Sequence, residues 1–327
     1  MKSVISTELI GHESKTLYII GNGFDLFHDL KTRYWNFHEW LVSSNYADDF
    51  VATLEQLFPA IKDGELLLWK DFETALGQYT LKQVHDDFFQ GVDDGLFDND
   101  IQESVVNRIR PQLERIPALL RKWIKTVPLE NLRQRLDLSK KSFYLTFNYT
   151  LLLEEVYYIP LGQIMHIHGC LKDNSPLITG HGEDKQEDNT DYGSINIEES
   201  LRLISQEMYK LKKPVKDIIT QHQPFFDSLK EITHVIVFGQ SLSKIDMPYF
   251  CKILCNVQDN TKWYFIVYDD TAKDNYKRIV NNFIDDCPKV YGRSRYLSKM
   301  KPENCKYIYT KDLKTEPAYE YWRMEWS

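Results

Sequence analysis

The chain has no long apolar run, either in its first residues, MKSVISTELIGHESK, or later, so we expect a cytoplasmic protein without a membrane partner. Its five cysteines form no C-x-x-C pair, which favours reduced thiols over a disulfide framework. With 40 Lys and Arg against 48 Asp and Glu, it lacks the overall basic field of non-specific nucleic-acid binders. A Walker A loop and a G-x-S-x-G elbow are also missing, which argues against P-loop and acyl-transfer chemistry.

Short segments rich in Ile, Val, Tyr and Phe alternate for the most part with stretches of helical periodicity. This alternation predicts an α/β protein with a Rossmann-like, mostly parallel sheet and helices on both faces. The expected strands are 17–20, 142–147, 163–167, 176–179, 233–238, 262–268 and 306–309. Later helices are expected at 196–221 and 272–285.

The wide gap between the first two expected strands is typical of helices. Segments such as WKDFETALGQYTL carry apolar residues at three- and four-residue spacing. We interpret 35–140 as a helical subdomain inserted into a single α/β domain, 1–327, whose Rossmann-like core resumes over 141–310. Pro111 should mark a helix start or a kink. The acidic stretch 181–194 is expected to form an exposed loop.

The first expected strand runs directly into Gly21-Asn22-Gly23, and a helix-compatible stretch follows. Such a turn lets backbone N–H groups approach a phosphate, with help from the helix N-terminus. The pattern G-x-G-x-x-G is incomplete, because Leu26 occupies the third glycine position, and glycines also serve simply to make tight turns. Asp25 could bind ribose hydroxyls or cap the helix.

Asn148 follows the expected strand 142–147, at the edge where open α/β sheets bind ligands. Asparagine is also a common turn residue, so the alternative is that Asn148 only satisfies a turn. The next helix should begin near Thr150, which is a suitable N-cap.

In the segment QIMHIHG, strand alternation places His166 and His168 on the same face. His168 stands at a strand end beside a glycine, and imidazole titrates near neutral pH, so His168 is a candidate general base. A structural histidine is one alternative. A metal pair is another, with its third ligand drawn from His181, Glu183 or Asp184, although no recognised zinc spacing is present.

Two later strands end in a similar way. VIVFGQSL leads into Gly239 and Ser241, which could hold a ribose or phosphate through backbone and hydroxyl contacts, and another strand ends near Asp269. An ordinary strand-to-helix turn is the alternative in each case. We expect Gly21, Asn148, His168 and Gly239 to converge at one edge of the sheet.

Four segments carry a resemblance to a known family: GNGFDLFHDLKTRYWNF, LTFNYTLLLE, HIHG and FGQSLSKIDMPYF. In order and chemistry they resemble the bacteriophage abortive-infection AbiH family over most of the chain, and WKDFETALG in the helical block does so too. The same landmarks are similar, more distantly, to sirtuin-like NAD-binding proteins.

The sirtuin-like resemblance implies roles for individual residues. Gly21 and Gly23 would cradle the pyrophosphate, and Asn148, in a T-x-N motif that begins at Thr146, would lie beside the nicotinamide ribose. His168 would be the general base, and the turn from Gly239 to Ser241 would contact the adenosine part. The sequence departs from sirtuins at Asn22, and it lacks their paired zinc cysteines, which argues against a protein deacetylase.

These observations predict an anti-phage abortive-infection protein that binds NAD or a related nucleotide and hydrolyses NAD at the nicotinamide–ribose bond. NAD is then the substrate, and no further cofactor or metal is required. A phage-derived trigger and a homo-oligomer are compatible partners. The alternatives are a non-catalytic sensor of a nucleotide or phage component, and a metal-dependent nuclease.

Overall fold

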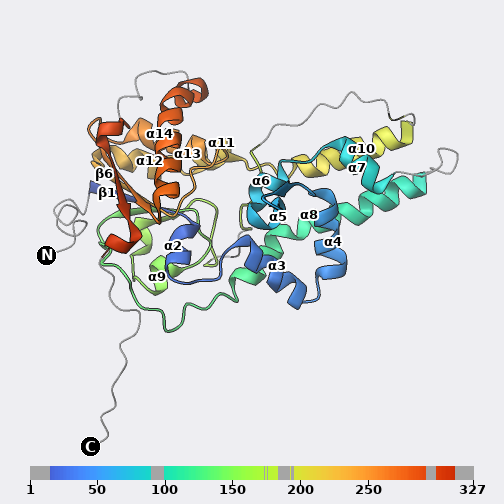
Figure 1. Cartoon of the computed structure of the whole chain (residues 1–327), viewed down its shortest axis with the longest axis horizontal. Coiled ribbons are helices and arrows are strands. Elements are labelled where there is room, and N and C mark those ends of the chain that lie inside the picture. Colours follow the sequence, from blue (N-terminus) through green and yellow to red (C-terminus); the bar gives the residue numbers. More distant parts are fainter. Residues whose placement is uncertain are drawn as a thin grey trace, which may run out of the picture. The chain divides into compact units, whose positions relative to one another are not determined.

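The computed structural model describes residues 15–89, 99–172, 174, 176–182, 192, 195–291 and 300–313. The chain divides into two compact units, each described by itself (Figure 1). The sheet unit comprises Met1–Lys31, Val127–Asn174 and Val215–Ser327, and the helical unit comprises Thr32–Thr126 and Ser175–Pro214. In the described part of the chain, no helix is long and apolar enough to cross a membrane.

The sheet unit holds one six-stranded sheet in which every neighbouring pair is parallel, in the order β5-β4-β1-β6-β7-β8. The first three strands of this sheet along the chain (β1, β4, β5) run outward from β1 on one side, and the next three (β6, β7, β8) run outward on the other. This is the strand order of dinucleotide-binding sheets, and it reverses between β1 and β6. The Rossmann-like α/β prediction is therefore confirmed. The strands are β1 Thr16–Ile20, β4 Phe143–Thr146, β5 Ile164–His166, β6 His234–Phe238, β7 Lys262–Val267 and β8 Cys305–Tyr309.

Helices cover both faces of this sheet because its strands are apolar on both sides. On one face, Ile20 and Phe238 pack with residues of α2 Asn22–Phe27 and α9 Leu152–Glu155. On the other, Phe265 contacts Tyr276 of α14, and Phe147, just beyond β4, stacks on Phe250 of α13. The remaining bounds are α13 Met247–Asn256, α14 Asp270–Tyr291, α11 Val215–Gln221, α12 Gln223–Asp227, and the 3-10 turns η3 Leu161–Gln163, η4 Ser228–Glu231, η6 Pro302–Asn304 and η7 Thr310–Asp312.

A buried histidine helps to hold α2 against the segment after α9. His28 is 1% exposed, its Nδ1 donates to the Phe24 carbonyl at 2.8 Å, and the Tyr157 hydroxyl donates to its Nε2 at 2.6 Å. Because a carbonyl only accepts, Nδ1 carries a hydrogen, and Nε2 accepts from the hydroxyl when the ring is neutral. Burial accordingly lowers the pKa of His28 to about 4.

The helical unit contains most of the predicted insertion 35–140 and is helical over most of 34–124, whereas residues 127–140 belong to the sheet unit. Phe37 packs against Trp69, Phe72 and Trp123, and α10 runs along α8 (Figure 1). Its elements are α3 Tyr34–Ser43, the π-helix η2 Ala47–Val51, α4 Ala52–Leu57, β2 Ile61–Lys62, β3 Glu65–Leu66, α5 Leu67–Lys70, α6 Phe72–Leu76, α7 Leu81–Phe88, α8 Asn99–Ile124 and α10 Ile195–Tyr209.

Two expectations for local structure were wrong, and a third was wrong in part. Pro111 lies inside α8, flanked by the buried Ile109 and Leu113, rather than at a helix start, and a kink there stays a prediction. Residues 176–179 form no strand; this segment leads to an isolated bridge between His181 and Lys212. The helix expected at 196–221 is interrupted: α10 ends before Pro214, and α11 begins directly after it.

Glycines allow the β1–α2 turn and the loop after β6 to touch through their backbones. The N–H of Gly21 donates to the Phe238 carbonyl, and that of Gly23 to the Gly239 carbonyl, both at 2.9 Å. A Cβ on Gly21 would lie 2.5 Å from the Gln240 Cα, and one on Gly23 would lie 2.6 Å from the Gly239 Cα. Gly239 also has φ +70°, a left-handed conformation that favours glycine.

We expect Gly239→Ala to destabilise the protein much more than Gly64→Ala. Both glycines have positive φ, but a Cβ on Gly239 would lie 2.4 Å from the Gly23 Cα, whereas one on Gly64 would meet nothing within 4 Å. Gly64→Ala should cost only left-handed strain, about 1–2 kcal/mol. Gly239→Ala should add about 1–3 kcal/mol of overpacking, measured by urea denaturation. Equal losses would show that the two loops are not in tight contact.

Candidate functional site

The strand register brings the predicted site residues to one edge of the sheet. Ile20 pairs with both Thr146 and Phe238, and Thr146 pairs with His166. Because all of these strands are parallel, the residues that follow them, Gly21, Asn148, His168 and Gly239, lie at the carboxyl edge. The shared edge is confirmed, and the expectation that these residues surround one cleft stays a prediction.

The glycine turn after β1 is already hydrogen-bonded. The Gly21 and Gly23 N–H groups both donate to carbonyls of the β6 segment. A phosphate could use these two donors only by displacing existing hydrogen bonds. The following helix, α2, has six residues, so the dipole it offers to an anion is small. The side chain of Asn22 in this turn is exposed.

A buried carboxylate joins the first two strand ends. Asp25 is 1% exposed, and its Oδ1 accepts from Asn148 Nδ2 at 2.9 Å while its Oδ2 accepts from Thr150 Oγ1 at 2.8 Å. Thr150 therefore does not cap a helix as expected, and α9 has Leu151 at its N-cap without a side-chain cap. Asp25 makes these contacts from within α2.

The surroundings fix how the Asn148 side chain points. Its Nδ2 donates to the Gly21 carbonyl at 3.1 Å as well as to Asp25. Since a backbone carbonyl only accepts, the amide nitrogen must be the atom that faces it. The amide oxygen therefore points away from both partners, and it is the atom with which Asn148 could accept a hydrogen bond from a ligand. Thr146 supports this turn, because its Oγ1 accepts from the Asn148 N–H at 3.1 Å.

Burial dominates the titration of Asp25 and raises the pKa of its carboxyl to about 7. Hydrogen bonds from Thr150 and Asn148 and the nearby His166 oppose this rise only in part. Asp25 thus exchanges its proton near neutral pH, directly beside the candidate ligand-binding amide.

His166 has a different role from His168. Its Nδ1 donates to the Asn148 carbonyl at 3.1 Å, and its Nε2 lies 2.7 Å from Glu154 Oε1. Because a carbonyl only accepts, the Nδ1 hydrogen faces Asn148, and Nε2 makes the contact with Glu154. This pair braces the Asn148 backbone from α9.

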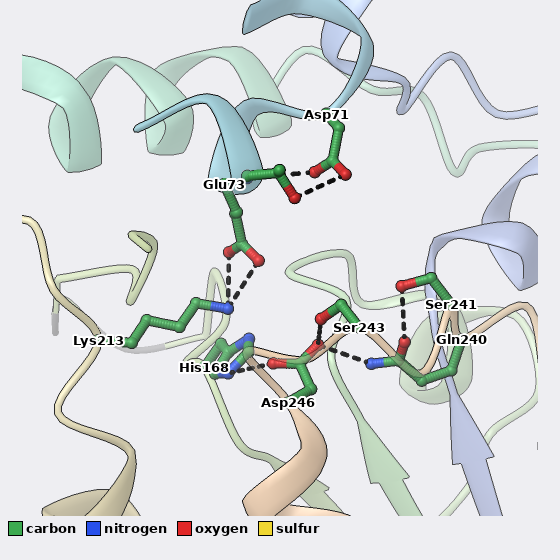
Figure 2. A network of polar contacts seen from close by, with 9 residues as sticks. Asp71, Glu73, His168, Lys213, Gln240, Ser241, Ser243 and Asp246 are labelled. Atoms are coloured by element: carbon green, nitrogen blue, oxygen red, sulfur yellow. Dashed lines mark hydrogen bonds and ion pairs between the residues drawn. The ribbon is translucent and has the colours of Figure 1, made fainter. Parts of the chain in front are cut away.

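His168 lies in a second polar cluster, shown in Figure 2. It is 3% exposed, its ring meets the edges of Phe147 and Tyr249, and its Nε2 lies 3.9 Å from Asp246 Oδ1. The prediction that His166 and His168 share one face was wrong. Strand β5 ends at His166, and the turn through Gly169, with φ +78°, breaks the alternation.

The same cluster contains two residues that the sequence reasoning did not select, Gln240 and Asp246. Gln240 Nε2 donates to Asp246 Oδ2 at 3.1 Å, and the exposed Ser241 donates its hydroxyl to Gln240 Oε1 at 3.3 Å. The sequence feature that could have identified them is their position, one and seven residues after the strand-end Gly239. Asp269 is exposed, and its Oδ1 accepts from the Ala272 N–H at 2.8 Å, as in a helix cap.

The metal alternative gains no support from the residues that the structure covers, among which no group of three or more His, Cys, Asp or Glu could hold a metal ion. His181 instead directs Nε2 to the Met208 carbonyl at 3.2 Å within the helical unit. Glu183, Asp184 and most of the expected acidic loop lie outside the described residues.

Comparison with known proteins gives one finding. Residues 17–267 match the family described as Bacteriophage abortive infection AbiH. No curated protein and no solved structure gives a match.

Two buried groups should give the stability opposite dependences on pH. The pKa of Asp25 is raised from its ordinary 3.8 to about 7, so its stabilising contribution is lost as pH rises through this interval. The pKa of His28 is lowered from 6.5 to about 4, so its contribution is lost as pH falls. Between about pH 4 and 6.5 the two slopes offset each other.

Asp25→Asn should therefore leave the pH dependence of stability that His28 contributes, without the opposing contribution of Asp25. The unfolding free energy of the variant minus that of the wild type should rise with pH by about 1.4 kcal/mol per unit between about pH 4 and 7. His28→Gln is the matched control, and its difference should fall with pH. Urea denaturation across this range measures both, and a flat Asp25→Asn difference would contradict the buried, proton-exchanging carboxyl.

Proposed function

The chain belongs to the bacteriophage abortive infection AbiH family, and we propose that it acts in anti-phage defence by binding NAD and hydrolysing its nicotinamide–ribose bond. Removal of NAD would stop the metabolism of an infected cell before phage replication is complete. Nicotinamide and ADP-ribose would be the products.

The observation that carries this proposal is the fixed amide of Asn148 at the carboxyl edge of a sheet with the dinucleotide-binding strand order. Gly21 and Asp25 hold the amide nitrogen, which leaves the oxygen to accept from a ribose hydroxyl. A rigid acceptor of this kind orients the sugar without a cost in side-chain entropy on binding.

In the proposed reaction, water adds to the anomeric carbon of the ribose as the bond to nicotinamide breaks. Nicotinamide leaves as a neutral molecule with the bonding electron pair, through a transition state with oxocarbenium character. His168 takes the proton of the attacking water or of a ribose hydroxyl. Asn148 positions the ribose, and Asp25 holds Asn148 in place.

The phosphates need binding partners other than the Gly21 and Gly23 N–H groups, because these already donate to backbone carbonyls. Gly21, Gly23 and Gly239 set the close approach of the two loops. We therefore assign phosphate and outer ribose contacts to exposed side chains that follow β1, β6 and β7, namely Asn22, Ser241 and Asp269. Asp269 suits a ribose hydroxyl rather than a phosphate because of its charge.

A nucleotide sensor without cleavage is the second candidate. It is favoured by one feature: Asn148 and His168 are held by separate partners, Asp25 in α2 and Asp246 beside α13. In that case, binding would signal to other proteins, and NAD would persist.

We expect Asn148→Ala and His168→Ala each to abolish phage protection in cells and to prevent the fall in NAD during infection. Loss of a general base typically costs about 10²–10⁴ in rate, enough to silence a toxic effector. His222→Ala is the matched control, because this half-buried histidine lies between α11 and α12 and follows none of the strands of the sheet. His166→Ala should have a smaller effect.

The cellular NAD level decides between the two candidates. Wild-type protection with constant NAD would reject the hydrolase and leave the sensor. Protection retained in both Asn148→Ala and His168→Ala would reject this edge of the sheet as the functional site.

Binding can be tested without a phage trigger. Calorimetry should detect NAD or ADP-ribose on the wild-type chain and at least tenfold weaker binding by Asn148→Ala, since a ribose hydrogen bond is lost (about 1.4 kcal/mol is tenfold). A substitution at Gly23 would be uninformative, because its Cβ would meet the Gly239 backbone. Wild-type protein that binds neither compound nor ATP would contradict the nucleotide site.

A further inference from the structure

Asp246 occupies a helix N-cap but does not cap the helix. It precedes α13 at that position, and its side chain makes no capping hydrogen bond. Aspartate is among the residues most favoured for capping, and loss of a cap typically costs about 1 kcal/mol. This aspartate is 5% exposed, so its carboxylate is directed into the protein instead.

The interior partners of Asp246 hold it in one orientation. Its Oδ2 accepts from Gln240 Nε2 at 3.1 Å and from Ser243 Oγ at 3.3 Å. Gln240 is itself fixed, because its Oε1 accepts from the Leu242 N–H at 3.1 Å and its carbonyl accepts from the Tyr276 hydroxyl at 2.6 Å. Figure 2 shows the second oxygen, Oδ1, directed at His168.

His168 has few ways to turn away from this carboxylate. Its ring packs against those of Phe147 and Tyr249 in edge-to-face arrangements, with centroids 5.3 Å and 5.7 Å away. Among the contacts of His168 described here, Asp246 is the acidic group and Tyr249 is a second titratable one. A carboxylate 3.9 Å from Nε2 in a buried setting stabilises the protonated imidazole.

We propose that Asp246 is the positioning residue for His168, orienting the imidazole and stabilising the imidazolium that forms when His168 accepts a proton. The FGQSLSKIDMPYF segment then orients the candidate base through Asp246, in addition to any contact with a phosphate or ribose. This inference rests on the proposed function for its catalytic meaning, but the pairing itself can be measured without any activity.

The direct test is histidine NMR on the full chain. The titration midpoint of His168, assigned from the signal lost in His168→Gln, should fall by about 1–3 pH units in Asp246→Asn. Asp246→Ser removes the same charge yet supplies a good N-cap, so it provides a second variant with a secure fold and should show the same fall. Glu154→Gln is the matched control, because Glu154 faces His166 instead and its loss should leave the midpoint of His168 unchanged.

The functional test follows NAD loss in infected cells and NAD turnover by purified protein. Asp246→Asn should lower kcat by about tenfold or more and leave KM within about twofold, because it acts on proton transfer and not on binding. Asp246→Glu, which keeps the charge, should recover part of the rate. The acid limb of the pH–rate profile should move to lower pH in Asp246→Asn.

The outcomes separate the two ideas. An unchanged His168 midpoint in both charge-removing variants overturns the pairing. Full activity of Asp246→Asn together with an inactive His168→Ala overturns the positioning role but leaves the hydrolase intact. Full activity of His168→Ala overturns the proposed mechanism, whereas a shifted midpoint would still support the Asp246–His168 pair.

Discussion

The backbone contact between the β1–α2 turn and the loop after β6 constrains the rest of the sheet unit. It lies where the strand order reverses, the place at which open α/β sheets usually leave a crevice for a ligand. Here Gly23 and Gly239 bring the two loops into direct hydrogen bonding. The polar groups that remain at the carboxyl edge are therefore arranged on either side of this contact, around Asp25 and around Asp246.

Each cluster meets the cost of burying a carboxylate in a different way. Asp25 accepts two neutral hydrogen bonds, and burial still raises the pKa of its carboxyl to about 7. Asp246 has an amide and a hydroxyl on one oxygen and an imidazole facing the other. Buried polar groups that are held this way keep one geometry, which a binding or catalytic site needs. Asn148 and His168 thus inherit their orientations from neighbouring carboxylates.

The sequence was sufficient to predict what depends on periodicity and on strand ends. Six of the seven expected strands, the parallel sheet and the shared edge of Gly21, Asn148, His168 and Gly239 follow from local patterns. It was insufficient for contacts between distant segments, such as Asp25 with Asn148 and Asp246 with His168. The strand expected at 176–179 failed because apolar content alone does not provide a pairing partner. Pro111 lies inside a helix rather than at its start because tertiary burial outweighs helix propensity.

The separation of the two clusters limits what a ligand must do. Asn148 faces the side of the sheet covered by α2, whereas His168 faces α13. A small ligand bound at Asn148 alone would leave His168 as a buried structural histidine. The proposed hydrolysis makes a stricter demand, because Asn148 and His168 would both act at one ribose. That ribose must therefore reach both clusters at once, whereas a sensor needs only a ligand that reaches one of them.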